Sequence, residues 1–230
     1  MSDRNRAYLI QAAKLLGPLL DELVFVGGVV TGLLITDRAA GESRVTIDID
    51  AIARILSYAE YTAFGERLRG LGFSEDTTEG APVCRWIQPP VILDVIPLDE
   101  GILGFSSRWY GPAMNAAASF RIAEDLDVRI VTAPYFLATK LEALRGRGQG
   151  DLFASKDLED VVGIIDGLPT IVAEVGGAPS DLIVFLFEEI GSLIANPRFQ
   201  DAIAGCLLPD AVSQARIRVV LERLHQILAL

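Results

Sequence analysis

Histidine and cysteine are scarce in this chain. Its 230 residues include one histidine, His225, and two cysteines, Cys84 and Cys206. A single histidine excludes a histidine-rich zinc site. We expect the two cysteines, which lie far apart in the sequence, to remain reduced thiols.

Long apolar runs are missing as well. The uncharged stretch over residues 23–36 has 14 residues and includes three glycines, whereas a membrane-spanning helix needs about 20. The first residues, Met-Ser-Asp-Arg-Asn-Arg, are polar and lack the apolar core of a signal peptide. We therefore expect a cytoplasmic protein with no membrane partner.

Positive charge is in short supply, because 20 Lys and Arg residues face 31 Asp and Glu residues and the net charge is −11. Nucleic-acid binding relies on Lys and Arg, so this balance argues against a broad nucleic-acid surface. A local exception consists of Arg129, Lys140, Arg145, Arg147 and Lys156. This basic stretch is either a phosphate-binding patch or a solvated helix face.

The hydrophobic content of 51% is that of a globular protein, and the order of the expected elements indicates an α+β fold. The first part mixes the two types of element. Strands are expected over residues 24–26, 45–52, 83–88, 91–96, 118–122 and 128–131. Helices are expected over residues 5–23, 29–36 and 58–71. After Thr132 only helices are expected, including 156–166, 181–194, 199–207 and 210–229, so we predict domains 1–130 and 131–230.

Three aspartates are candidates for a metal site. Asp48 and Asp50 are two residues apart in one expected strand, and Asp94 interrupts the apolar run 91–96 of another. Because side chains alternate along a strand, Asp48 and Asp50 should share one face. The opposite face is expected to carry Val45, Ile47, Ile49 and Ala51.

Carboxylates gathered on neighbouring strands repel one another unless a cation lies between them. Hard oxygen ligands of this kind suit Mg²⁺. Asp94 favours the metal interpretation, because a carboxylate among Val, Ile and Leu is costly to bury without a partner. The alternatives are a solvated strand face for Asp48 and Asp50 and a solvent-facing strand end for Asp94.

Two further patterns bear on phosphate binding. Gly27 and Gly28 separate an expected strand from an expected helix, where glycine lets backbone amides approach an anion; the alternative is an ordinary turn. Lys140 lies on an apolar helix face and either extends to solvent or reaches into a site. Asp157 lies in the first turn of the helix that Ser155 is expected to cap. It either belongs to a site or simply interacts favourably with the helix dipole.

Together these motifs resemble the DNA polymerase β-type nucleotidyltransferase superfamily. The resemblance is carried by Val26-Gly-Gly, by the run Arg-Val-Thr-Ile-Asp-Ile-Asp over residues 44–50, and by Leu-Asp-Val over residues 93–95. Residues 139–143, Arg147 and residues 156–160 are similar to the AbiEii branch, which comprises bacterial toxins of abortive-infection and toxin–antitoxin systems. The superfamily often has Gly-Ser where this chain has Gly-Gly, so one hydroxyl contact to phosphate is missing.

The resemblance implies a nucleotidyltransferase-type mixed sheet domain with a C-terminal helical domain. It also implies transfer of a nucleoside monophosphate from a nucleoside triphosphate (NTP) to an acceptor, with release of pyrophosphate. The implied catalytic and metal-binding residues, which would hold two Mg²⁺ ions, are Asp48, Asp50 and Asp94. The implied nucleotide-binding residues are Gly27, Gly28, Lys140 and Asp157.

The acceptor implied by the resemblance is the 3′ end of tRNA. In that case the enzyme acts as a growth-blocking toxin with a cognate antitoxin protein as partner. One alternative is a nucleotidyltransferase that modifies a small molecule or a protein hydroxyl. Another is a nucleotide-binding or antitoxin-binding module without turnover.

Overall fold

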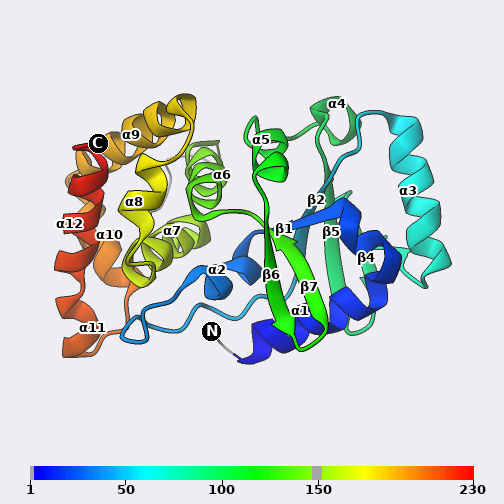
Figure 1. Ribbon diagram of the computed structural model, residues 1–230, viewed down its shortest axis with the longest axis horizontal. Coiled ribbons are helices and arrows are strands. Elements are labelled where there is room, and N and C mark those ends of the chain that lie inside the picture. The colour runs from blue at the N-terminus through cyan, green and yellow to red at the C-terminus, as the bar shows by residue number, and fades with distance from the viewer. Residues whose placement is uncertain (1–2, 147–151) are drawn as a thin grey trace. The chain divides into compact units, whose positions relative to one another are not determined.

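The computed structural model describes residues 3–146 and 152–230 (Figure 1). The chain divides into two compact units. The first comprises Met1–Gly32 and Arg44–Thr132, and the second comprises Leu33–Ser43 and Ala133–Leu230. The first unit holds a mixed seven-stranded sheet and the second is helical, so the predicted α+β class is confirmed.

The sheet of the first unit has the order β3-β4-β5-β2-β1-β7-β6. Its strands are β1 (Leu23–Val26), β2 (Ile49–Ala53), β3 (Ser74–Glu75), β4 (Arg85–Gln88), β5 (Val91–Pro97), β6 (Ala118–Ala123) and β7 (Leu126–Ile130). Strand β2 runs parallel to β5 and β1 runs parallel to β7, whereas the other neighbouring pairs are antiparallel. The central strands β1, β2 and β5 are almost wholly buried, as expected for strands covered on both faces.

Helices cover this sheet. They are α1 (Asp3–Leu16), the 3₁₀ turn η1 (Gly17–Glu22), α2 (Gly28–Leu34), α3 (Tyr58–Gly70), α4 (Glu100–Leu103) and α5 (Tyr110–Asn115). Helix α1 contacts both β5 and β6, and therefore runs across the strands between them. Helix α3 packs on β4, where a Cβ atom added at Gly65 would lie 3.0 Å from the Trp86 ring. Trp86 thus faces α3, and its neighbour Arg85 faces the other side of the sheet.

The first helix is shorter than the expected 5–23. Helix α1 ends at Leu16, and η1 leads directly into β1 at Leu23. Gly17 has a φ of +47°, and Pro18 has no backbone N–H to continue the α-helical hydrogen bonding. The sequence pattern predicted a longer helix because Leu19 and Leu23 continue its apolar periodicity. Both are buried, although Leu19 lies in η1 and Leu23 begins β1.

The expected strand 45–52 is also shorter, since β2 begins at Ile49. Val45 and Ile47 were expected to share one strand face with Ile49, but they precede β2 and are 51% and 72% exposed, whereas Ile49 is buried. That part of the prediction is wrong. The buried Asn5 side chain explains the difference. It donates to the carbonyl of Arg44 (2.9 Å) and accepts from the N–H of Thr46 (3.1 Å), so these backbone groups bond to helix α1 instead of a strand.

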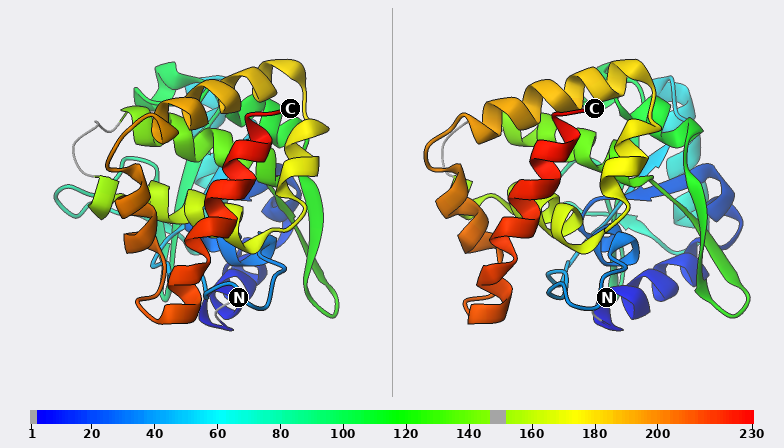
Figure 2. Two further views of the ribbon diagram at one scale, coloured as in Figure 1. Left: turned by 90° about the vertical axis from the view of Figure 1, so that its left-hand side faces the viewer. Right: turned by 60° about the vertical axis from the view of Figure 1, so that its left-hand side comes forward.

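The described part of the second unit is built largely from helices, and the C-terminal helix lies at the front of both views in Figure 2. They are α6 (Ala133–Gly146), η2 (Leu152–Ala154), α7 (Lys156–Gly167), α8 (Ile171–Gly176), α9 (Ser180–Ile194), α10 (Phe199–Cys206), α11 (Ala211–Ala215) and α12 (Ile217–Ile227). Helix α12 contacts α7, α8 and α10. The expected helix 210–229 is divided into α11 and α12 at Arg216.

Across the two described stretches of chain, none of the helices combines the length and the apolar character that crossing a bilayer requires.

An N-terminal segment, residues 33–43, belongs to the second unit. The N–H groups of Thr36 and Asp37 both donate to the carbonyl of Gly167, at 2.9 Å each. Arg216 donates from Nη2 to Asp37 (2.7 Å) and from Nε to Asp166 (2.8 Å). The Asp166 side chain is 2% exposed, so Arg216 neutralises a buried carboxylate and holds the segment at the same time.

Replacing Arg216 with Met should therefore destabilise the second unit strongly. The substitution keeps most of the aliphatic volume but leaves Asp166 buried without its partner, which costs about 3–5 kcal/mol in comparable cases. The measurement is urea unfolding followed by circular dichroism. Arg218→Met, at an exposed position two residues further along in α12, is the matched control, and equal midpoints for the two variants would contradict the prediction.

Candidate active site

The centre of the site is a row of residues that runs across three neighbouring strands. In β5, Asp94 pairs in register with Asp50 of β2 on one side and with Arg85 of β4 on the other. Side chains of directly paired residues lie on the same face of a sheet. The backbone register alone therefore brings Asp50, Asp94 and Arg85 together on one face.

Arg85 binds two of the three predicted carboxylates. It forms a two-pronged contact with Asp94, from Nε to Oδ1 (2.8 Å) and from Nη2 to Oδ2 (2.7 Å). The same Nη2 donates to Asp48 Oδ2 at 2.9 Å. The Asp94 and Arg85 side chains are 8% and 17% exposed, and the hydrogen bond to Asp94 raises the pKa of Arg85 above its ordinary value. The guanidinium therefore remains charged and joins Asp48 to Asp94.

Asp48 lies just before β2 and is held there by residues of helix α1 and the preceding segment. The Thr46 hydroxyl donates to Asp48 Oδ1 at 3.1 Å. The Tyr8 hydroxyl donates to the carbonyl of Ile47 (2.9 Å) and accepts from the N–H of Ile92 (2.8 Å), the residue two before Asp94. Burial raises the pKa of Tyr8, so it stays a neutral donor. Tyr8 thus ties the Asp48 segment to the strand that carries Asp94.

Gly27 forms the wall of the site next to Asp50. It has a φ of +69°, a conformation that favours glycine, and it joins β1 to α2. A Cβ atom at this position would lie 1.9 Å from Asp50 Oδ2. At Gly28 a Cβ atom would lie 2.7 Å from Nη2 of Arg44. Gly27 is therefore required for the close approach of the Asp50 carboxylate, whereas a Cβ atom at Gly28 would meet only the flexible end of the Arg44 side chain.

The carboxylates offer the right atoms for a divalent cation, but their present arrangement already contains a cation. Among the described residues, no group of three or more His, Cys, Asp or Glu side chains is placed to hold a metal ion. Both oxygens of Asp94 instead accept hydrogen bonds from Arg85. The donor chemistry suits Mg²⁺, and the geometry as it stands suits a guanidinium.

Lys140 and Asp157, the other two predicted nucleotide-binding residues, lie together in the second unit. Lys140 Nζ is 3.2 Å from Asp157 Oδ1 and 2.7 Å from Asp160 Oδ2. All three side chains are at most 12% exposed, so of the two alternatives for Lys140 the extension to solvent is not found. Arg145 pairs with Glu189, and Arg147 lies outside the described residues.

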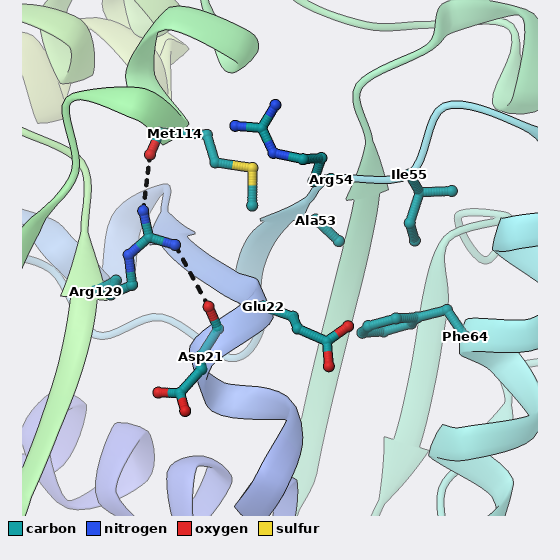
Figure 3. Close-up of a pocket in the computed structure, with 8 residues that line it drawn as sticks. All are labelled: Asp21, Glu22, Ala53, Arg54, Ile55, Phe64, Met114 and Arg129. Atoms are coloured by element: carbon teal, nitrogen blue, oxygen red, sulfur yellow. Dashed lines mark hydrogen bonds between the residues drawn. The ribbon is translucent and has the colours of Figure 1, made fainter.

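A separate cavity of about 340 Å³ opens at the far end of strands β1 and β2 from Gly27 and Asp50 (Figure 3). Its polar lining is largely occupied by contacts within the protein. Arg129 donates to the carbonyls of Met114 (2.9 Å) and Asp21 (3.4 Å), and Arg54 donates to Asn115 (2.6 Å). We therefore place the chemistry at the carboxylate row and not in this cavity.

The two cysteines are free, as expected. Burial raises the pKa of Cys84 to about 12 and that of Cys206 to about 11. Both thiols therefore stay protonated near neutral pH and are poor nucleophiles.

Sequence reasoning missed Arg85 and the supporting residues Asn5 and Tyr8. Arg85 could have been found, because a hairpin that turns at Pro89 and Pro90 pairs the residues on either side of the turn symmetrically. Gln88 then faces Val91, and three steps further out Arg85 faces Asp94. The two helix residues carry no comparable signal, since their partners are 39 or more positions away in sequence.

Substitution of Gly27 by Ala should displace Asp50 and destabilise the first unit. The left-handed backbone alone costs a residue with a Cβ about 1–2 kcal/mol, and the overlap with Asp50 Oδ2 adds to this. Gly70→Ala is the control, because a Cβ atom there meets nothing within 4 Å at the end of α3, and it should be neutral or slightly stabilising. Thermal unfolding of both variants tests this; a Gly27→Ala protein as stable as wild type would refute it.

Comparison with known proteins is informative at the level of the fold. No family model and no curated protein matches the chain. JHP933 from Helicobacter pylori is similar in structure, with 11% identity and a TM-score of 0.52 over 100% of this chain and 94% of that one. An antigenic nucleotidyltransferase-like protein from Paracoccidioides brasiliensis gives 17% identity and a TM-score of 0.49 over 89% of this chain and 94% of that one. The similarity to JHP933 therefore shows a shared fold along the full length of this chain.

Proposed function

We propose that this protein is a metal-dependent nucleotidyltransferase that moves a nucleoside monophosphate from an NTP to an acceptor hydroxyl and releases pyrophosphate. The observation that supports this proposal is the meeting of three carboxylates at one place. Asp50 and Asp94 are paired in register, and Asp48 is joined to Asp94 through one guanidinium nitrogen. The Gly27 turn lies directly beside them. This arrangement matches the roles that the sequence motifs imply.

Each residue has a defined task in this proposal. Asp48, Asp50 and Asp94 would hold two Mg²⁺ ions, which stabilise the attacking and leaving oxygens of an in-line displacement. Asp94 is the most buried of the three and would accept the proton of the acceptor hydroxyl or orient it. Gly27 and Gly28 would bring backbone amides close to the triphosphate.

For the acceptor we propose the 3′ end of tRNA, with the protein acting as a toxin held in check by a cognate antitoxin. This part rests on the AbiEii-like motifs. Transfer to a small molecule or a protein hydroxyl uses the same carboxylates and differs only in the acceptor. One observation favours a second candidate function, a nucleotide-binding module without turnover: Arg85 already occupies both oxygens of Asp94.

The decisive experiment incubates the protein with each labelled NTP, Mg²⁺ and total cellular RNA, and asks which species becomes labelled. A parallel reaction with cell extract in place of RNA tests protein and small-molecule acceptors. Asp50→Asn should abolish transfer while its unfolding midpoint stays at or above that of wild type, because one repulsive carboxylate is removed. Asp125→Asn, in the exposed turn between β6 and β7 of the same unit, is the control and should transfer normally.

Asp94→Asn separates binding from chemistry. We expect NTP affinity to change little and single-turnover transfer to fall about 10²-fold or more, as for loss of a catalytic acid or base. Full activity in the Asp50→Asn protein, or activity that survives exhaustive chelation of metal, would sink the proposed reaction. NTP binding without any labelled product would favour the binding module.

Lys140 is proposed to bind the triphosphate, with Asp157 as its orienting partner. Lys140→Met should then weaken NTP binding in calorimetry by about tenfold or more, since a lysine near phosphate acts as a point charge. Arg145→Met, on the same helix but more than half exposed and paired with Glu189, should have little effect. If Lys140→Met lowers the unfolding midpoint but leaves NTP affinity intact, Lys140 only neutralises Asp157 and Asp160.

A further inference from the structure

The Asp94 carboxylate needs a positive partner at all times. Its side chain is 8% exposed in the middle of a buried strand, and an unpaired charge in such surroundings is strongly destabilising. Arg85 supplies that partner in the structure through its bonds to both oxygens of Asp94. The fold therefore contains its own counter-ion for the site.

A metal ion and Arg85 compete for the same carboxylates. Nε and Nη2 of Arg85 already donate to both oxygens of Asp94 and to one oxygen of Asp48, so a divalent cation on those oxygens would lie close to a guanidinium of like charge and be repelled by it. Guanidinium–carboxylate pairs with two parallel bonds are among the stronger hydrogen bonds in proteins. The guanidinium therefore opposes metal binding, and the site gains metal affinity when the guanidinium withdraws.

We propose that Arg85 is a built-in competitor of the catalytic metal, so that the site alternates between an arginine-closed form and a metal-bound form. This inference rests on the proposed function and adds a regulatory step to it. The arginine-closed form keeps the first unit folded when free metal is low. Apparent metal affinity is reduced in proportion to the population of the closed form.

Arg85 is well placed for such an exchange. Strand β4 has only the two-residue strand β3 beyond it, so Arg85 enters the row from the side of the sheet edge. Its side chain is 17% exposed, whereas that of Asp94 is 8% exposed. A long side chain that reaches solvent can withdraw by rotation about its own bonds, and the strand that carries Asp94 need not move.

The test is calorimetric titration of Mg²⁺ alone, without nucleotide, into wild type, Arg85→Gln, Arg85→Lys and Arg121→Gln. Gln removes the charge and should tighten Mg²⁺ binding by about 10- to 100-fold. This is the range expected from the loss of a charge-assisted contact that stabilises the closed form. Lys keeps the charge but cannot make the two parallel hydrogen bonds of a guanidinium, so the Mg²⁺ affinity of Arg85→Lys should lie between those of wild type and Arg85→Gln. Arg121→Gln, in the exposed β6–β7 hairpin, should match wild type.

Thermal unfolding with and without Mg²⁺ provides the second readout. It remains informative if Arg85→Gln is less stable than wild type in the absence of metal. Mg²⁺ should raise the unfolding temperature of Arg85→Gln by more than that of wild type, because it replaces the missing counter-ion. Equal Mg²⁺ affinities in wild type and Arg85→Gln would overturn the inference and leave the proposed reaction standing. Absence of Mg²⁺ binding in both would overturn the inference and the metal-dependent function together.

Discussion

The first unit depends on one electrostatic constraint, the neutralisation of a carboxylate inside a sheet. Asp94 lies in a strand whose neighbours are apolar and buried. Its pairing with Asp50 doubles the negative charge at that point, and Arg85 on the opposite neighbour offsets it. The φ of +69° at Gly27 and the anchoring of Asp48 by Thr46 are further adjustments that let acidic side chains crowd onto one face.

The candidate site was predictable where the information is local. Alternation along a strand and an aspartate within an apolar run were enough to place Asp50 and Asp94 on adjacent strands, with Asp48 just before the first of them. The exposure of Val45 and Ile47 was not predictable in the same way. Their backbone is held by a side chain from helix α1, and a periodicity over eight residues carries no record of such a distant partner.

The helical unit shows the same division between local and distant information. Ser155 caps α7 as expected by accepting from the N–H of Leu158 at 3.2 Å, and Lys140 meets Asp157 as the motifs imply. The contact of Arg216 with Asp37 joins residues 179 positions apart. Both residues look like ordinary surface charges in the sequence, so their pairing, and the place of residues 33–43 in this unit, could only come from the structure.

Membership of residues 33–43 in the second unit has a consequence for how the protein is made. The chain passes from one unit to the other at Gly32, at Ser43 and again at Thr132. During synthesis residues 33–43 emerge early, but Gly167 and Arg216, which bind them, emerge much later. Until then the apolar Ile35 and the open hydrogen-bonding groups of this segment lack their native partners. A chain truncated after Thr132 therefore contains the complete sheet sequence, but residues 33–43 lack their hydrogen-bonding partners. Such a chain is a natural target for chaperones and proteases.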